Sequence, residues 1–374
     1  MWGNSLKIAR LQGFDIKVDA SWLLIAALIV WSLATAYFPT QMPDAQMPTL
    51  LVMAVGAMLG LFASLILHEL AHAIIARRFG LQVSGITLFL FGGVAELQSE
   101  PLSGKTEFWI AIAGPVASLC VALAFWVCAH LANLLGAPAP LGAVVSYLAL
   151  LNLVLALFNL LPAFPMDGGR VLRAWMWARS GDLLSATRRA VTISTAFAYG
   201  LMALGLYTAF SGAIAGGLWP VLIGLFLLAA SRSALVGLET EVALDGRSVA
   251  NLMTPNPRTV DPDLSLSALV NQVFLKYAIS FIPVVENGVL LGYVDTKIVQ
   301  KIDREHWTTT KVEDVVENSS DDNTVAHDMT AMDLMKQIAK TGRRKFLVVD
   351  ASGLVGVISL SDMIAVLNVS KDIS

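Results

Sequence analysis

Long apolar stretches alternate with short polar ones over the first two thirds of the chain, and this pattern predicts a bundle of membrane-spanning helices. A helix needs roughly 20 apolar residues to cross a bilayer. Stretches of suitable length cover residues 20–38, 50–79, 108–135, 141–161, 191–210 and 219–238. Residues 170–190 are polar enough to form a helical connection outside the bilayer.

A short stretch between the second and third predicted spans has a different pattern. Two β-prone runs, residues 86–91 and 94–97, flank Gly92 and Gly93. Such runs around a glycine pair are typical of a β-hairpin. We therefore expect a short membrane-associated hairpin here, and a local break of the third helix at Gly114-Pro115.

Composition separates the last third of the chain from the rest. The whole chain is 56% hydrophobic and 14% charged, as in multi-pass membrane proteins. Up to Thr240 there are 12 Lys/Arg and 10 Asp/Glu, and 13 and 18 follow, which together give the net charge of -3. The tail is therefore a mildly acidic soluble segment with no charge signature of nucleic-acid binding.

The distribution of basic residues predicts the orientation. Residues 39–49, 136–140 and 211–218 contain no Lys or Arg, so the positive-inside rule assigns them to the outer side. With six spans, the N-terminus and the tail then both lie in the cytoplasm, and the protein is a multi-pass protein of the cell membrane.

A metal-binding pattern lies near the inner end of the second predicted span. His68 and His72 are four residues apart and share one face of a helix. Glu69 lies about 100° further around the helix, close enough to handle a water molecule at the metal. This ligand set suits zinc with an open catalytic position. Ionisable groups inside a membrane are costly and usually functional.

The predicted topology favours one candidate for a third ligand. The second and fourth spans both run inward, so Asp167 reaches the same membrane face as the histidines. Asp182, in the polar connection, and Glu96, in the hairpin, are less well placed. His130 lies near the outer end of the third span and is read as an interfacial histidine.

Together these residues resemble the site-2 protease family of intramembrane zinc metalloproteases. The resemblance rests on the His68-Glu69-Leu70-Ala71-His72 motif, on residues 159–169 as N-x-x-P-x-x-P-x-D-G-G, on Gly92-Gly93 and on Ala113-Gly114-Pro115. It implies that His68, His72 and Asp167 bind zinc, that Glu69 is the general base, and that Asn159 hydrogen-bonds the substrate backbone or the oxyanion.

The same resemblance implies a substrate-binding strand at Phe91, Gly92, Gly93 and Val94. A helical peptide bond hides its carbonyl in the hydrogen-bond ladder, so cleavage requires unwinding, and an edge strand can pair with the unwound segment. The implied substrate is a single-pass membrane protein, cut within or near the bilayer. A plain re-entrant turn is the alternative reading of the two glycines.

An internal repeat with a period of about 64 residues covers the tail. Val284-Val285 recurs as Val348-Val349, and Thr259-Val260 recurs as Thr324-Val325. Each unit alternates short strands with helices. The tail resembles a tandem pair of CBS domains, here assigned to residues 247–305 and 308–374 after a membrane domain at 1–240. The resemblance implies binding of an adenine nucleotide (ATP, ADP or AMP) and dimerisation.

Two residues of the tail match the ribose contacts of CBS domains. Ser359 and Asp362 form the Ser-x-x-Asp pattern after the last predicted strand, whereas the first repeat has Asp295 and Ile298 at these positions. One of the two usual nucleotide sites is therefore in doubt. Ser359 can alternatively serve as a helix N-cap alone, and the tail can be a dimerisation module without a ligand.

The sequence favours a zinc endopeptidase of regulated intramembrane proteolysis over two alternatives. A CBS-gated channel or transporter with a His/Asp ion site should show inverted repeats, broken helices near the midplane or several charges along a path. A metal-free scaffold should have lost metal ligands. The chain has one cluster near one face, with every ligand position intact.

Overall fold

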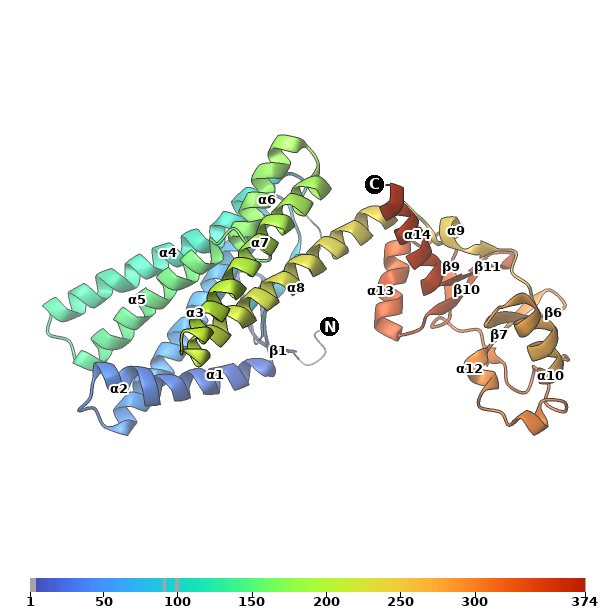
Figure 1. Cartoon of the computed structure of the whole chain (residues 1–374), viewed down its shortest axis with the longest axis horizontal. Helices are drawn as coiled ribbons and strands as arrows, with labels where there is room; N and C mark the ends of the chain where they lie inside the picture. The colour runs from blue at the N-terminus through green and yellow to red at the C-terminus, as the bar shows by residue number, and fades with distance from the viewer. Residues whose placement is uncertain (1–4, 90–91, 98–100, 374) are drawn as a thin grey trace. The chain divides into compact units, whose positions relative to one another are not determined.

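The computed structural model describes residues 5–89, 92–97 and 101–373 (Figure 1). The chain divides into two compact units, Met1–Val236 and Gly237–Ser374. The last helix of the first unit, α8, continues into the second unit.

Six helices in the described part of the chain are long and apolar enough to cross a membrane, which confirms the predicted helical membrane fold. The first span, Ser21–Gln41, joins α1 (Ser21–Ser32), a π-helical turn (Leu33–Tyr37) and α2 (Phe38–Gln41). The other spans are α3 (Met47–Arg78), α4 (Gly104–Leu134), α5 (Ala139–Asn159), α7 (Leu183–Phe210) and α8 (Ile214–Leu244). Helix α6 (Asp167–Ser180) is the first part of the predicted polar connection.

One expectation about proline was wrong, and a second proline lies inside the first span. Helix α4 runs unbroken through Gly114 and Pro115, because transmembrane helices tolerate proline where neighbouring groups satisfy the freed backbone carbonyl. The first span continues past Pro39. Pro39 lies in the first turn of α2, where a missing N–H has little cost.

Strands from before the first span and from after the second span form one four-stranded sheet. Its strands are β1 (Ser5–Leu11), β2 (Phe14–Asp19), β3 (Val83–Phe89) and β4 (Gly92–Leu97), in the order β1-β2-β3-β4. Strands β3 and β4 are antiparallel, as expected, but Gly92 and Gly93 begin β4 and do not form the turn. The membrane association of this hairpin stays a prediction.

Strands β1 and β2 were not among the predicted elements. The signal was present, because Phe14, Ile16 and Val18 alternate with polar residues and are all buried. Gln12 and Gly13, both with positive φ, form the tight turn between the two strands. Strand β2 pairs in parallel with β3, so the N-terminal segment is part of the same sheet as the hairpin.

Two faces of α3 carry different side chains. The face with Phe62, Ile66 and Leu70 packs against the buried residues of the sheet. The face with Ser64, His68 and His72 is buried among other helices. A Cβ at Gly60 would collide with the Leu148 side chain of α5, so the small residue permits this close packing.

The second unit contains two small sheets, one in each repeat. The first, in the order β6-β7-β8, is formed by Phe281–Glu286, Val289–Asp295 and Glu317–Asn318. The second, in the order β5-β11-β10-β9, is formed by Thr254–Pro255, Gly353–Ser359, Lys345–Asp350 and Thr324–Ala326. The remaining helical segments are α9 (Val249–Leu252), α10 (Leu266–Ala268), a π-helical segment (Leu269–Phe274), α11 (Leu275–Tyr277), α12 (Thr296–Val299), a 3-10 turn (Arg304–His306), α13 (Ala331–Thr341) and α14 (Leu360–Ile373).

The internal repeat is visible in the strand pairing. Val260 bridges in parallel to Val284, and Val325 pairs in parallel with the equivalent Val348. The two repeats also exchange strands: β5, from the start of the first repeat, pairs with β11, and β8, from the start of the second, pairs with β7. The repeats are therefore interlocked through their backbones.

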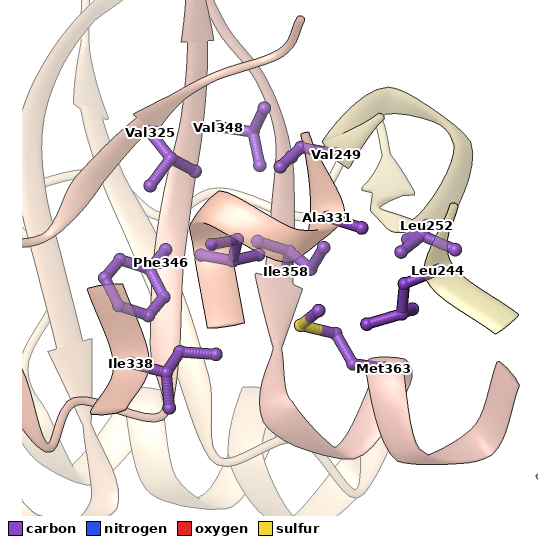
Figure 2. Close-up of a cluster of buried hydrophobic side chains, with 11 residues drawn as sticks. Leu244, Val249, Leu252, Val325, Ala331, Ile338, Phe346, Val348, Ile358 and Met363 are labelled. Carbon is purple, nitrogen blue, oxygen red and sulfur yellow. The ribbon is translucent and has the colours of Figure 1, made fainter. Parts of the chain in front are cut away.

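The second repeat has a continuous apolar core (Figure 2). Phe346, Val348 and Ile358 from its sheet are buried together with Ile338 of α13 and Met363 of α14. Leu244, in the last turn of α8, belongs to the same cluster and is only 1% exposed. The end of the last spanning helix is thus anchored in the core of the second repeat.

Candidate metal centre

Three side chains from α3 and α6 converge on one point. The Asp167 Oδ2 atom lies 3.1 Å from His68 Nε2 and 3.2 Å from His72 Nε2. The two Nε2 atoms lie 3.2 Å apart. All three residues are buried, with exposed fractions of 4%, 6% and 8% for His68, His72 and Asp167. The structure thus brings together the three residues expected to bind metal, and no other such group occurs among the described residues.

Hydrogen bonds on the far side of each imidazole orient the two rings. His72 Nδ1 donates to the carbonyl of Ile110, at 2.7 Å, and His68 Nδ1 lies 2.9 Å from the Ser118 hydroxyl. A carbonyl can only accept, so the His72 proton is on Nδ1 and its Nε2 presents a lone pair. Such partners are typical of metal-binding histidines.

The converging atoms suit a cation. When each imidazole carries its proton on Nδ1, as His72 does, both Nε2 atoms are acceptors, and an ionised carboxylate oxygen is an acceptor as well. Donor atoms about 2.0–2.1 Å from a tetrahedral zinc lie about 3.3 Å from one another. The separations of 3.1 and 3.2 Å between the three atoms therefore fit zinc.

Gly114 of α4 faces the two imidazoles closely. A Cβ at this position would lie 2.6 Å from His68 Nε2 and closer still to His72 Nε2. No larger residue fits without displacing the two rings. Glycine at position 114 is required because of what faces it from α3.

The loop between α5 and α6 positions Asp167. The Phe164 N–H donates to Ser194 Oγ of α7, at 2.6 Å. A Cβ at Gly168 would collide with the carbonyls of Leu160 and Leu161, so the loop folds directly onto the start of α6. Asp167, in the first turn of α6, is thereby directed toward α3.

The Glu69 side chain of α3 lies against the edge strand β4. A Cβ at Gly93 would be 2.6 Å from Glu69 Cγ and 3.1 Å from Glu69 Cδ. The backbone of β4 therefore passes directly over this side chain. Gly92, Gly93 and Val94 pair on one side with Phe89, Leu88 and Thr87 of β3, and β4 is the last strand of the sheet. Phe91 lies outside the described residues.

The other sequence-predicted candidates near this centre have different environments. Asn159 is the last residue of α5, partly exposed, and lies at the start of the loop that leads to Asp167. Asp182 accepts a hydrogen bond from the Leu184 N–H and caps α7. His130 stacks on Trp126 with ring centroids 4.2 Å apart. The Glu96 side chain lies outside the described part of the chain.

The Ser-x-x-Asp pattern of the second repeat forms a local cap. Ser359 Oγ and the Ser359 N–H both donate to Asp362 Oδ2, at 2.7 and 2.8 Å. In the first repeat, Asp295 accepts from the Ile298 N–H at 2.9 Å. Both repeats therefore have a capped helix start, and only the second has a carboxylate at the fourth position.

Arg343 connects the two repeats electrostatically. Its Nη1 atom donates to the Tyr293 hydroxyl, at 3.0 Å, and to Glu317 Oε1, at 2.8 Å. Burial of the Tyr293 hydroxyl, together with its hydrogen bond to Glu317, raises the pKa of Tyr293 to about 12.

Several residues that support the centre were not identified from the sequence. Ser118 and the Ile110 carbonyl orient the histidines, and Glu107 and Arg173 form a buried ion pair between α4 and α6. Gly114 was noted only as part of a motif. The available signal was the series 107, 110, 114 and 118, which lies on one face of a helix.

Comparisons with known proteins match both units. The sequence profile of Peptidase family M50 matches residues 56–137 and 136–203, and that of the CBS domain matches residues 249–302 and 312–369. A Mycobacterium tuberculosis protein named "Putative zinc metalloprotease Rip3" is 34% identical over 370 residues, which cover 98% of this chain and 94% of that protein.

Two further similarities come from Methanocaldococcus jannaschii. A zinc metalloprotease of this organism is 32% identical over 311 residues, which cover 83% of this chain and 84% of that protein. The solved structure of a site-2 protease aligns with 61% of this chain and 94% of its own, with 27% sequence identity and a TM-score of 0.41.

Proposed function

The chain belongs to Peptidase family M50 and is a membrane zinc metalloprotease with CBS domains, and from this we propose that it hydrolyses a peptide bond within or near the transmembrane segment of a membrane protein. The observation that carries the proposal is the convergence of His68 Nε2, His72 Nε2 and Asp167 Oδ2, with separations of 3.1 and 3.2 Å. These three atoms are the proposed zinc ligands.

Zinc bound by these residues would polarise the scissile carbonyl and lower the pKa of water to about 7. Glu69 follows the first ligand directly and is the proposed general base. Its carboxylate takes the proton of the attacking water and returns it to the leaving amine. Ser118 and the Ile110 carbonyl keep the Nδ1 protons in place and both Nε2 lone pairs directed at the ion.

The edge strand β4 is the proposed substrate-binding element. A transmembrane substrate must be unwound before its carbonyl is accessible, and pairing with β4 would replace the lost helical hydrogen bonds. The contact of the β4 backbone at Gly93 with Glu69 supports this role, because an added strand would lie close to the general base. Asn159, at the end of α5, is the proposed hydrogen-bond donor to the substrate backbone or the oxyanion.

The proposed orientation places the N-terminus and the CBS domains in the cytoplasm. It is supported by the lack of Lys and Arg in residues 39–49, 136–140 and 211–218. The metal centre would then face the cytoplasmic side. Reporter fusions at the N-terminus and at the C-terminus should both give a cytoplasmic signal.

A cleavage assay with zinc analysis tests the protease proposal. The full-length protein in proteoliposomes, supplied with candidate single-pass membrane proteins, should cleave one of them and contain about one zinc per chain. Glu69→Gln should keep the zinc and lose activity by about 10²- to 10⁴-fold. Full activity of metal-free protein, or undiminished turnover by Glu69→Gln, contradicts the proposal.

The CBS domains are proposed to bind an adenine nucleotide at Ser359 and Asp362, and so to regulate the protease. The local cap at this position does not distinguish a ribose contact from a helix cap alone. Thr330 and Asp333 provide a matched control, because the Thr330 hydroxyl also donates to the carboxylate three residues later, at 2.8 Å. Asp362→Ala should weaken ATP or AMP binding, while Asp333→Ala should lose only a cap. Equal nucleotide affinities of the two variants would contradict a ribose contact at Asp362.

Dimerisation through the CBS domains is the remaining proposal. The first repeat has exposed apolar side chains, including Leu275 and Val289, which are 70% and 63% exposed and at which such an interface can be tested. Leu275→Glu should shift the full-length protein in detergent from dimer to monomer in light scattering. A monomeric wild type would contradict this assignment.

A further inference from the structure

One buried ion pair of the membrane unit lies outside the proposed catalytic groups. Glu107 of α4 is 0% exposed and Arg173 of α6 is 6% exposed. Arg173 Nε donates to Glu107 Oε1 at 2.8 Å, its Nη2 contacts the same oxygen, and Arg170 Nε lies 3.8 Å from it. Buried charges are costly, and breaking such a pair leaves an uncompensated charge. The pair therefore needs an explanation.

Its position on α4 relates it to the metal centre. Three other residues of the same helix face contact the centre: Ile110 through its carbonyl to His72, Gly114 through its closeness to both Nε2 atoms, and Ser118 through its hydroxyl to His68. Glu107 lies about one helical turn before Ile110. One face of α4 thus contacts both histidines. Through Glu107, the same face also contacts α6, the helix that carries Asp167.

Its position on α6 relates it to the third ligand. Asp167 starts α6 and Arg173 lies six residues later in the same helix. The Arg173 guanidinium also lies over the Phe164 ring, 5.0 Å from its centroid, so it contacts the loop that precedes Asp167. A Cβ at Gly104 would be 2.5 Å from the Ala174 carbonyl oxygen, so α4 and α6 are in backbone contact beside the pair.

From these contacts we propose that Glu107 and Arg173 are positioning residues for the zinc site. The pair fixes the rotation and translation of α6 on α4, and thereby the placement of Asp167 Oδ2 against the two histidines. It touches neither substrate nor metal. This inference rests on the proposed zinc ligands. Supporting groups that act through a ligand typically change metal affinity by about 10- to 100-fold.

Glu107→Gln is the most informative variant. Glutamine has the same shape, and its oxygen can still accept from Arg173. Its amide would occupy the place of Glu107 Oε2, which has no hydrogen-bond partner among the described residues. The variant should therefore fold while the charge that holds Arg173 is lost. Arg173→Lys is the second variant, because a lysine cannot reproduce the planar contacts of the guanidinium.

Two measurements on the purified full-length protein in detergent test the inference without an activity assay. The zinc dissociation constant, from competition with a chelator, should rise about 10- to 100-fold in both variants. The visible spectrum of the cobalt-substituted protein should change, because a displaced carboxylate alters the ligand field. Arg179→Lys is the matched control: it is on the same helix and stacks on Trp175 at 4.2 Å, and should change neither readout.

The outcomes are distinguishable from failure of the proposed function. If the wild type binds no zinc, the proposed ligands are wrong. If the wild type binds zinc and Glu107→Gln has the same affinity and cobalt spectrum, the ligands stand and the positioning role is refuted. If Glu107→Gln does not yield folded protein, Arg173→Lys decides by the same two readouts. Ser118→Ala serves as the positive reference, because it removes the His68 partner directly.

Discussion

Asp167 and Asp362 both lie in the first turn of a helix, but their carboxylates serve different kinds of structure. Asp362 accepts hydrogen bonds from Ser359, three residues earlier in the chain. Asp167 meets His68, which is 99 residues away. The hydrogen bonds of Asp362 form within one helical turn. The contacts of Asp167 form only when α3, α4 and α6 are packed together.

The comparison shows why the two units tolerate change differently. A helix cap stabilises by about 0.5–2 kcal/mol and its loss is local. The metal centre has no local substitute, because each histidine is held by a residue on another helix. Changes around Asp167 should therefore have large effects on function, and changes around Asp362 should have small effects on stability.

The largest effect is expected for Gly114→Ala. Its Cβ would lie 2.6 Å from His68 Nε2 and closer to His72 Nε2, so the zinc content should fall from about one per chain to almost none and cleavage should be lost. Elemental analysis measures the zinc. Gly56→Ala, at a position in α3 with nothing within 4 Å of the added Cβ, is the control and should retain metal. A zinc-loaded, active Gly114→Ala protein would show that the centre is less tightly enclosed than the structure indicates.

A smaller functional effect is expected for Gly93→Ala. The new methyl group would press on Glu69 Cγ, at 2.6 Å, and displace the proposed general base without touching the zinc ligands. Cleavage should fall about 10²-fold or more, within the range that general-base catalysis contributes, and zinc content should stay unchanged. Turnover equal to wild type would argue against close contact of β4 and Glu69.

A still smaller effect, confined to stability when no nucleotide is present, is expected for Ser359→Ala. Loss of the cap should lower the protection of α14 amides in hydrogen exchange by about 1 kcal/mol, with zinc content and nucleotide-free cleavage unchanged. Ser352→Ala, in an exposed turn, is the control. A drop in cleavage would indicate that the local cap of the second repeat is coupled to the membrane unit.

The smallest expected effect is a change of stability with pH. The pKa of Tyr293, raised to about 12 by burial and by its Glu317 hydrogen bond, exceeds the ordinary value of 10.0. Between these two pH values the folded state keeps the Tyr293 proton and the unfolded state loses it. The contribution of Tyr293 to stability is therefore complete below pH 10 and is lost as the pH rises toward 12. An ultraviolet titration of the phenolates should lose its step near pH 12 in Tyr293→Phe. Loss of a step near pH 10 would contradict the burial of this hydroxyl.

Much of the fold was predictable because the signals are periodic or cumulative. The lengths of the apolar runs predicted six spans, and the positions 68 and 72 predicted a shared helix face. The repeat of Val284 as Val348 predicted two equivalent sheets, which the parallel pairing of both residues confirms. The choice of Asp167 needed only the topology, because two spans running in the same direction end at the same membrane face.

Other features were missed or misjudged because a neighbour in space overrides the local signal. Gly114-Pro115 suggested a break, but α4 continues through it, and the glycine is needed for the space opposite two imidazoles. Gly92 and Gly93 suggested a turn, but they begin a strand that passes over Glu69. Strands β1 and β2 were not predicted although their alternation is visible in the sequence, and only the folded chain shows that β2 pairs with β3, which lies beyond two spanning helices.

The amino-acid sequence was enough to establish a six-helix membrane protein with a repeated soluble tail and to select His68, Glu69, His72 and Asp167 for inspection. It could not reveal that the Ile110 carbonyl and the Ser118 hydroxyl orient the imidazoles, or that Glu107 and Arg173 join α4 to α6. These contacts join residues that are 38, 50 and 66 positions apart. Their geometry depends on the rotation and depth at which helices pack, which no local pattern of residues encodes.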